Sequence, residues 1–176
     1  MNGIWFRAAL LSACALVLTG GAVSAGEAGK AEKAGGVRDV DWHNSEFSVP
    51  PVGSCPWQQV RFAAGAGETA EHVYRFAPDR DIVFADVTGE GVEDALIVMQ
   101  CGPRDAEYST ALIAMTADAA PLGTVSNPGV WTRQPADFTV WYGDIAVRVT
   151  DFDTGEGWTE YYRWASSAKA FVRVDG

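Results

Sequence analysis

The apolar residues of this chain fall into short runs that are separated by turn-forming residues. Residues 82–85, 95–101 and 110–115 are such runs, and the last two are apolar at almost every position. A run that is apolar throughout is typical of a central strand whose two faces are both covered. Gly102 and Pro103 end the second run. We therefore expect a β structure with these two runs at the centre of a sheet.

The second half of the chain has the alternation of a half-buried strand. Residues 145–149 alternate between larger and smaller or polar side chains, and Gly143-Asp144 separates them from the run at 138–142 in the manner of a two-residue hairpin turn. No long stretch has a helical period, and 68–74, which comes closest, is short. We predict an all-β fold, an antiparallel sandwich or partly closed sheet; the alternative is an α+β fold with one short helix. The expected strands are 59–62, 72–76, 82–85, 95–101, 110–115, 122–125, 138–142, 145–149, 158–164 and 171–174.

The N-terminus has the pattern of an export signal. Residues 1–25 carry one positive charge, Arg7, followed by an apolar run and the small residues of a cleavage site. The run is shorter than the roughly 20 residues of a transmembrane helix, so we expect no membrane span. As an alternative, Cys14 ends a lipobox-like tetrapeptide and would carry a lipid anchor. Residues 26–40, rich in Ala, Gly, Glu and Lys, predict a flexible linker before a single β domain at 41–176.

The charge balance of the chain excludes some partners. The sequence holds 13 Lys and Arg against 23 Asp and Glu, a formal net charge of −10 at pH 7. A surface this acidic repels phosphate backbones and anionic lipids, so we expect no nucleic-acid partner. The composition agrees with a secreted or cell-envelope protein.

The chain after residue 25 contains one pair of cysteines, Cys55 and Cys101. An even pair in an exported protein favours a disulfide, and a loop of this length gives about 4 kcal/mol in the chain-entropy account. A catalytic thiol is the alternative, but no C-x-x-C spacing is present. We therefore predict a structural cross-link.

An acidic loop joins the apolar runs at 82–85 and 95–101. Oxygen-bearing side chains occupy its first, third, fifth and ninth positions, and a glycine at the sixth permits a sharp turn. This is the spacing of a calcium-binding loop, so calcium is the candidate cofactor. The alternative is a polar turn in which Asp86 caps backbone amides and the other acids face water. The candidate metal ligands are the side chains of Asp86, Thr88, Glu90 and Asp94 and the carbonyl of Val92.

The sequence DVTGEGVED at 86–94, followed by an apolar strand, resembles the calcium loop of FG-GAP and VCBS repeats. Thr88 stands where those repeats have Asn or Asp, and Glu90 where they have Asp, so both would be weaker ligands. One copy alone does not imply a propeller, because blades need neighbours. The same loop, with Cys101 ending the next strand and the later residues 122–125, is similar to LppP/LprE-type bacterial envelope lipoproteins. That resemblance implies a cell-envelope location and no established chemistry.

The sequence offers no specific catalytic motif, since carboxylate pairs such as Asp151 and Asp153, which could serve glycoside hydrolysis, are common in acidic proteins. His43 and His72 are the only histidines, and neither lies in a zinc-binding spacing such as H-E-x-x-H. The nucleophile motif G-x-S-x-G is also missing. We therefore name no catalytic residue and expect a non-enzymatic protein.

Aromatic residues concentrate in the second half of the chain. Exposed rings on a β surface stack on sugars, which makes a carbohydrate- or cell-wall-binding module the alternative function; the other interpretation is that the rings fill a core. With a period of two, Trp158, Tyr162 and Trp164 share one face and Tyr161 lies on the other. The main expectation is a non-catalytic extracellular protein whose partner is unknown. The candidate ligand-binding residues are Trp141, Trp158, Tyr161, Tyr162 and Trp164.

Overall fold

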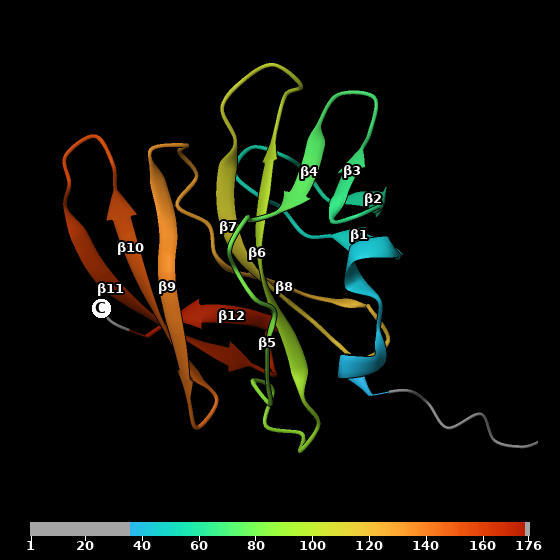
Figure 1. The fold of residues 1–176 in the computed structure, drawn as a ribbon. Helices are drawn as coiled ribbons and strands as arrows, with labels where there is room; N and C mark the ends of the chain where they lie inside the picture. Colours follow the sequence, from blue (N-terminus) through green and yellow to red (C-terminus); the bar gives the residue numbers. More distant parts are fainter. Residues whose placement is uncertain (1–35, 175–176) are drawn as a thin grey trace, which may run out of the picture. The chain divides into compact units, whose positions relative to one another are not determined.

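The computed structural model describes residues 36–174 (Figure 1). The predicted signal peptide, Cys14 and the first part of the predicted linker lie outside these residues. The described chain is nearly all β, as predicted, and its helical elements are two 3-10 turns, η1 (Val37–Asp39) and η2 (Trp42–Asn44). The alternative fold with one short α-helix is therefore not observed in residues 36–174. No helix in this range is long and apolar enough to cross a bilayer.

The strands of the described chain pair antiparallel in three sheets (Figure 1). The small sheet contains β1 (Glu46–Val49) and β2 (Gln58–Arg61). The six-stranded sheet has the order β3-β4-β6-β7-β8, with β5 also paired to β6; its strands are β3 (Ala66–Glu68), β4 (Val73–Phe76), β5 (Val83–Ala85), β6 (Asp94–Gly102), β7 (Ser109–Met115) and β8 (Pro121–Ser126). The four-stranded sheet has the order β12-β11-β10-β9; its strands are β9 (Arg133–Trp141), β10 (Asp144–Asp151), β11 (Gly157–Ala165) and β12 (Ala170–Arg173).

Strands β6 and β7 lie at the centre of the fold and are buried on both faces, as their apolar runs predict. Alternate residues of β6 serve two different cores. Ile97 and Met99 pack in a core with Phe47, on the side of the small sheet. Leu96 packs in the other core with Ile145 of the four-stranded sheet. The period of two along one strand thus joins all three sheets.

The four-stranded sheet packs one face against β6 and β7. Alternate residues of β10, from Ile145 to Val149, are fully buried on this face, which confirms the predicted half-buried strand. The turn between β9 and β10 is formed by Tyr142 and Gly143, one residue earlier than the predicted Gly143-Asp144. Both have positive φ, 49° and 83°. That is the conformation of a type I′ hairpin turn, whose twist matches the flanking strands.

The predicted disulfide between Cys55 and Cys101 is present, and both cysteines are only 1% exposed. Cys55 lies in the loop between β1 and β2, and Cys101 lies near the end of β6. The cross-link therefore fastens the small sheet's connecting loop to the central strand of the fold.

The last five residues of the predicted linker, 36–40, belong to the packed structure. Val37 is 2% exposed, and its carbonyl accepts a hydrogen bond from the indole nitrogen of Trp42 at 3.1 Å. Arg38 donates two hydrogen bonds to Glu93, at 2.7 and 2.9 Å. The packed part of the chain thus begins before the predicted boundary at residue 41, because Val37 supplies an apolar side chain to the core.

Candidate functional site

Two adjoining hollows lie where the ends of β9 and β10, in the four-stranded sheet, meet the strands β4, β6 and β7. Their volumes are about 400 and about 620 Å³, which is the size of small-molecule sites. They share Glu107, Trp131 and Thr132, and we call them together the Trp131 groove. The smaller hollow is lined by Arg75, Gln100, Glu107, Tyr108, Trp131, Thr132, Gln134 and Phe152. The larger hollow is lined by Ser54, Glu107, Ser109, Gly129, Val130, Trp131, Thr132, Arg133, Asp151, Asp153 and Thr154.

Aromatic rings form the apolar surface of the groove. Trp131 is 50% exposed and Phe152 is 61% exposed, although residues of this size are usually covered. The backbone amide of Phe152 donates to the carbonyl of Thr132 at 2.8 Å, which holds the β10–β11 turn beside the segment that carries Trp131. Tyr108, half-buried, contributes a third ring to the same hollow. The groove is therefore lined by aromatic rings, and a backbone hydrogen bond joins the two loop segments that carry Trp131 and Phe152.

A cation with ordered neighbours lines the smaller hollow. Arg75 on β4 lies opposite Gln100 on β6, and its Nε donates to the Gln100 side-chain oxygen at 2.7 Å. The guanidinium also lies over the ring of Tyr108, 4.1 Å from its centroid. Stacking and the hydrogen bond together fix the plane of the guanidinium.

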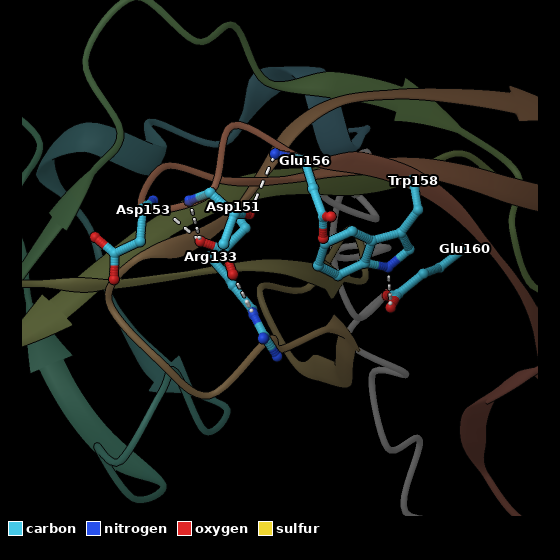
Figure 2. Close-up of polar contacts among 7 residues, drawn as sticks. Arg133, Asp151, Asp153, Glu156, Trp158 and Glu160 are labelled. Atoms are coloured by element: carbon cyan, nitrogen blue, oxygen red, sulfur yellow. Dashed lines mark hydrogen bonds and ion pairs between the residues drawn. The ribbon is translucent and has the colours of Figure 1, made fainter.

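The other wall of the groove is held by an ion pair. Arg133 Nε donates to Asp151 at 2.8 Å, and the other oxygen of Asp151 accepts the amide of Asp153 at 3.0 Å. The Arg133 hydrogen bond is the main cause that lowers the pKa of Asp151. Figure 2 shows the Asp153 carboxylate pointing away from Arg133. Asp151 thus stabilises the β10–β11 turn through these hydrogen bonds, while Asp153 is exposed.

A buried carboxylate, Glu160, organises the inner face of β11. It accepts hydrogen bonds from the Trp158 indole nitrogen at 2.9 Å and the Tyr162 hydroxyl at 2.6 Å, and it pairs with Arg173 at 2.9 Å (Figure 2 shows Trp158 beside Glu160). Burial, followed by the hydrogen bond to Glu160, raises the pKa of Tyr162 to about 12. Every polar group here has a partner, so the cluster stabilises the sheet.

The five aromatic residues predicted as a ligand surface do not form one exposed row. Trp158 and Tyr162 turn toward Glu160 and the core, and Trp164 packs on Phe171, because the period of two places them on the inner face. Only Trp141 and Tyr161 are strongly exposed, at 72% and 46%. They lie on β9 and β11, on the opposite face from the core.

The acidic loop forms a turn closed by its own aspartates. Both oxygens of Asp86 accept backbone amides, those of Gly89, Glu90 and Gly91, at 2.7, 3.1 and 2.8 Å. Desolvation acts to raise the pKa of Asp86, but these amides together outweigh it and the pKa is lowered. The capping by Asp86 agrees with the polar turn predicted as the alternative, but Asp94 is buried and does not face water.

The remaining predicted metal ligands are spread around that turn. Asp94 is 4% exposed and accepts the amide of Val87 at 3.2 Å, and burial raises its pKa. Glu90 and Val92 face solvent. Within residues 36–174, no group of three or more His, Cys, Asp or Glu residues is placed to hold a metal ion. Calcium binding by this loop stays a prediction.

This chain matches no protein-family model, no curated protein and no solved structure. The resemblances to FG-GAP or VCBS repeats and to LppP/LprE-type lipoproteins therefore stay predictions. The function has to be argued from the groove itself.

The groove residues were not singled out by the sequence. Arg75 and Gln100 sit on strands that look structural, and Tyr108 follows a polar loop. One signal was present: Trp131 follows the turn-forming residues Asn127 to Gly129. Loops after such residues lie on the surface, so a large ring there is expected to be exposed. What joins these residues is sheet stacking, which local patterns do not encode.

Proposed function

We propose that this chain is a non-catalytic glycan-binding domain that works outside the cytoplasm. The observation that carries the proposal is the Trp131 groove, in which half-exposed rings of Trp131 and Phe152 border the same hollow as Arg75, Gln100 and Gln134. The proposal keeps the carbohydrate-binding function predicted as the alternative, but it moves the binding surface from the aromatic residues of β9 and β11 to the groove.

The chemistry of the lining suits a sugar. A pyranose has an apolar C–H face that packs on an aromatic ring, and a rim of hydroxyls that needs hydrogen-bond partners. Trp131 and Phe152 offer the ring surfaces. Amide, carboxylate and hydroxyl groups from Gln134, Glu107 and Thr132 line the same hollow as donors and acceptors.

The groove favours binding over catalysis. Hydrolysis of a glycosidic bond needs two carboxyl groups, one of which is kept protonated by burial. Asp151 is occupied by Arg133, and Glu107 and Asp153 are exposed. His43, a general-base type of residue, lines a different hollow.

The location is supported by the cross-link. A buried disulfide, Cys55–Cys101, is typical of chains that fold in an oxidising compartment. The export signal predicted for residues 1–25 points in the same direction. A secreted or envelope-bound glycan binder unites both observations.

Substitution of one ring tests the proposal. We expect Trp131→Ala to weaken retention on insoluble polysaccharides or peptidoglycan by about 30-fold or more, because a central aromatic anchor contributes about 2 kcal/mol or more. Pull-down isotherms on a panel of insoluble glycans measure the affinity, and circular dichroism verifies that the variant is folded.

Two further tryptophans serve as controls. Trp57, 53% exposed, lies outside the groove, and Trp57→Ala should leave retention unchanged. Trp141→Ala separates the groove from the outer face of the four-stranded sheet. Retention that survives Trp131→Ala but is lost in Trp141→Ala would place binding on that outer face and contradict the groove proposal.

A further inference from the structure

Arg75 is one of three arginines in residues 36–174 without an ion pair, the others being Arg80 and Arg148, and it alone of the three lines the Trp131 groove. The chain has a formal net charge of −10, and arginines are expected to find carboxylates easily. In the part of the chain that the structure describes, six arginines form ion pairs. Within residues 36–174 Arg75 forms none, although it lines the smaller hollow of the groove. No carboxylate in residues 36–174 therefore lies within ion-pair distance of its guanidinium.

The surroundings of Arg75 hold its guanidinium in one orientation. Its Nε is bonded to Gln100, and the Gln100 side-chain nitrogen lies 3.5 Å from the hydroxyl of Thr110 on the next strand. The Tyr108 ring lies against the guanidinium face. Residues on or next to three neighbouring strands thus orient the Arg75 side chain. Its conformational entropy is therefore lost when the chain folds and not when a ligand binds.

The part of Arg75 left for a ligand is its pair of terminal nitrogens. Among the described residues the bond from Nε to Gln100 is the only hydrogen bond of the Arg75 side chain. A guanidinium whose two terminal nitrogens are unoccupied presents parallel N–H donors that match a carboxylate. Glu107, in the same hollow, is exposed and forms no ion pair with Arg75. The Glu107 carboxylate can therefore accept hydrogen bonds from hydroxyl groups of the same ligand.

We infer that Arg75 makes the groove selective for sugars that carry a carboxylate, either as a uronic acid or on a ring substituent. This inference rests on the proposed glycan-binding function. The sugar ring packs on Trp131 or Phe152, the carboxylate pairs with the terminal nitrogens of Arg75, and the hydroxyls bond to Gln134 and Glu107. A neutral sugar makes the same ring contacts but leaves the guanidinium without an anion.

A matched pair of ligands tests the selectivity. Trigalacturonate and its carboxyl-reduced, neutral counterpart are titrated into the protein at about 0.15 M salt, where long-range repulsion from the acidic surface is screened. We expect the acidic trisaccharide to bind at least about 10-fold more tightly, the effect of one charged hydrogen bond. Arg75→Gln should lower the affinity for the acidic trisaccharide to about that for the neutral form, and so remove this preference.

Further variants separate the two proposals. Arg148 is exposed, also forms no ion pair within residues 36–174 and lines a small hollow elsewhere, so Arg148→Gln should keep the preference. Arg75→Lys keeps the positive charge but lacks the planar guanidinium, so it should keep only part of the preference for the acidic trisaccharide. Equal affinity of the wild-type protein for both trisaccharides, with Trp131→Ala weakening both, would overturn the carboxylate inference and leave glycan binding standing.

A second arm covers the other source of the carboxylate. Soluble peptidoglycan fragments carry it on a substituent of the sugar, and they are compared with fragments whose carboxyl groups are amidated. A preference lost in Arg75→Gln in either arm supports the inference. No binding of any fragment or trisaccharide, with no effect of Trp131→Ala, would overturn both the inference and the proposed function.

Discussion

Glu160 and Tyr162 show how a charged residue is kept inside a β layer. Glu160 as a residue is 9% exposed, and Trp158, Tyr162 and Arg173 all donate hydrogen bonds to its carboxylate. Its charge is therefore compensated on every side. The same arrangement makes the ionised form of Tyr162 costly, since a phenolate would stand beside a carboxylate in a partly buried site.

Alkaline pH should weaken the fold through Tyr162. Its pKa is about 12 in the folded protein and about 10 when unfolded, so the unfolded state loses the proton first and stability falls as pH rises from 10 to 12. We expect Tyr162→Phe to cost about 1 kcal/mol at pH 8 and to flatten the decline above pH 10 by about 1–2 kcal/mol. Urea unfolding of both proteins across this range measures it. An equally steep decline in Tyr162→Phe would contradict the assignment.

Asp86 gives a second prediction at the level of one side chain. Removing its carboxylate in Asp86→Ala leaves the amides of Gly89, Glu90 and Gly91 without their acceptor, and we expect a loss of about 1–2 kcal/mol. Thermal unfolding in calcium and in chelator serves as the measurement. The same loss in both solutions fits the polar turn; a melting temperature that rises with calcium only in the wild-type protein would establish the metal site.

At the level of elements, strand positions were readable where the pattern was local and strong. The runs that became β6 and β7 were predicted as central strands because both of their faces are apolar. Strand β3 was missed because it contains Gly67, whose Cβ would lie 2.5 Å from Val60. The glycine there permits close contact with β2, a tertiary requirement that resembles a turn when only the sequence is seen.

The β9–β10 hairpin offers a stabilising substitution. Tyr142 has a φ of 49° and is 94% exposed, so its ring gains little from burial while its backbone sits in the left-handed region. Asn prefers this conformation in a type I′ turn, and we expect Tyr142→Asn to raise stability by about 0.5 kcal/mol. Gly143→Ala, at a φ of 83°, should lower it by about 1 kcal/mol. Calorimetric melting of the two variants tests the pair; melting temperatures that move the opposite way would contradict it.

At the level of the whole molecule, the all-β class and the cross-link were predictable, whereas the groove was not. Apolar periodicity and an even pair of cysteines act through neighbouring residues or simple counting. The groove gathers residues from Ser54 to Thr154, and it depends on how the ends of two sheets meet. The period of two in the sequence predicted the inner and outer faces of β11. That the exposed rings of the groove come from loops was visible only in the packed structure.

Removal of the cross-link should affect stability and binding together. Cys55 follows Ser54 and Cys101 follows Gln100, and both of these neighbours line the groove. We expect the double variant Cys55→Ala, Cys101→Ala to lose about 4 kcal/mol of stability. Its affinity for glycan at temperatures where it is still folded should also fall, as measured by titration beside the wild-type protein. Unchanged affinity would show that the groove keeps its lining without the bond.

The position of these two sulfur atoms links the chemistry of the surroundings to the state of the binding surface. If the chain is exported as predicted, free thiols in a reducing compartment would leave the neighbouring lining residues Ser54 and Gln100 without this bond beside them. Oxidation in the compartment where the proposed glycan ligands occur would then complete the binding surface, and newly made copies of a glycan-binding chain would bind saccharides poorly before export.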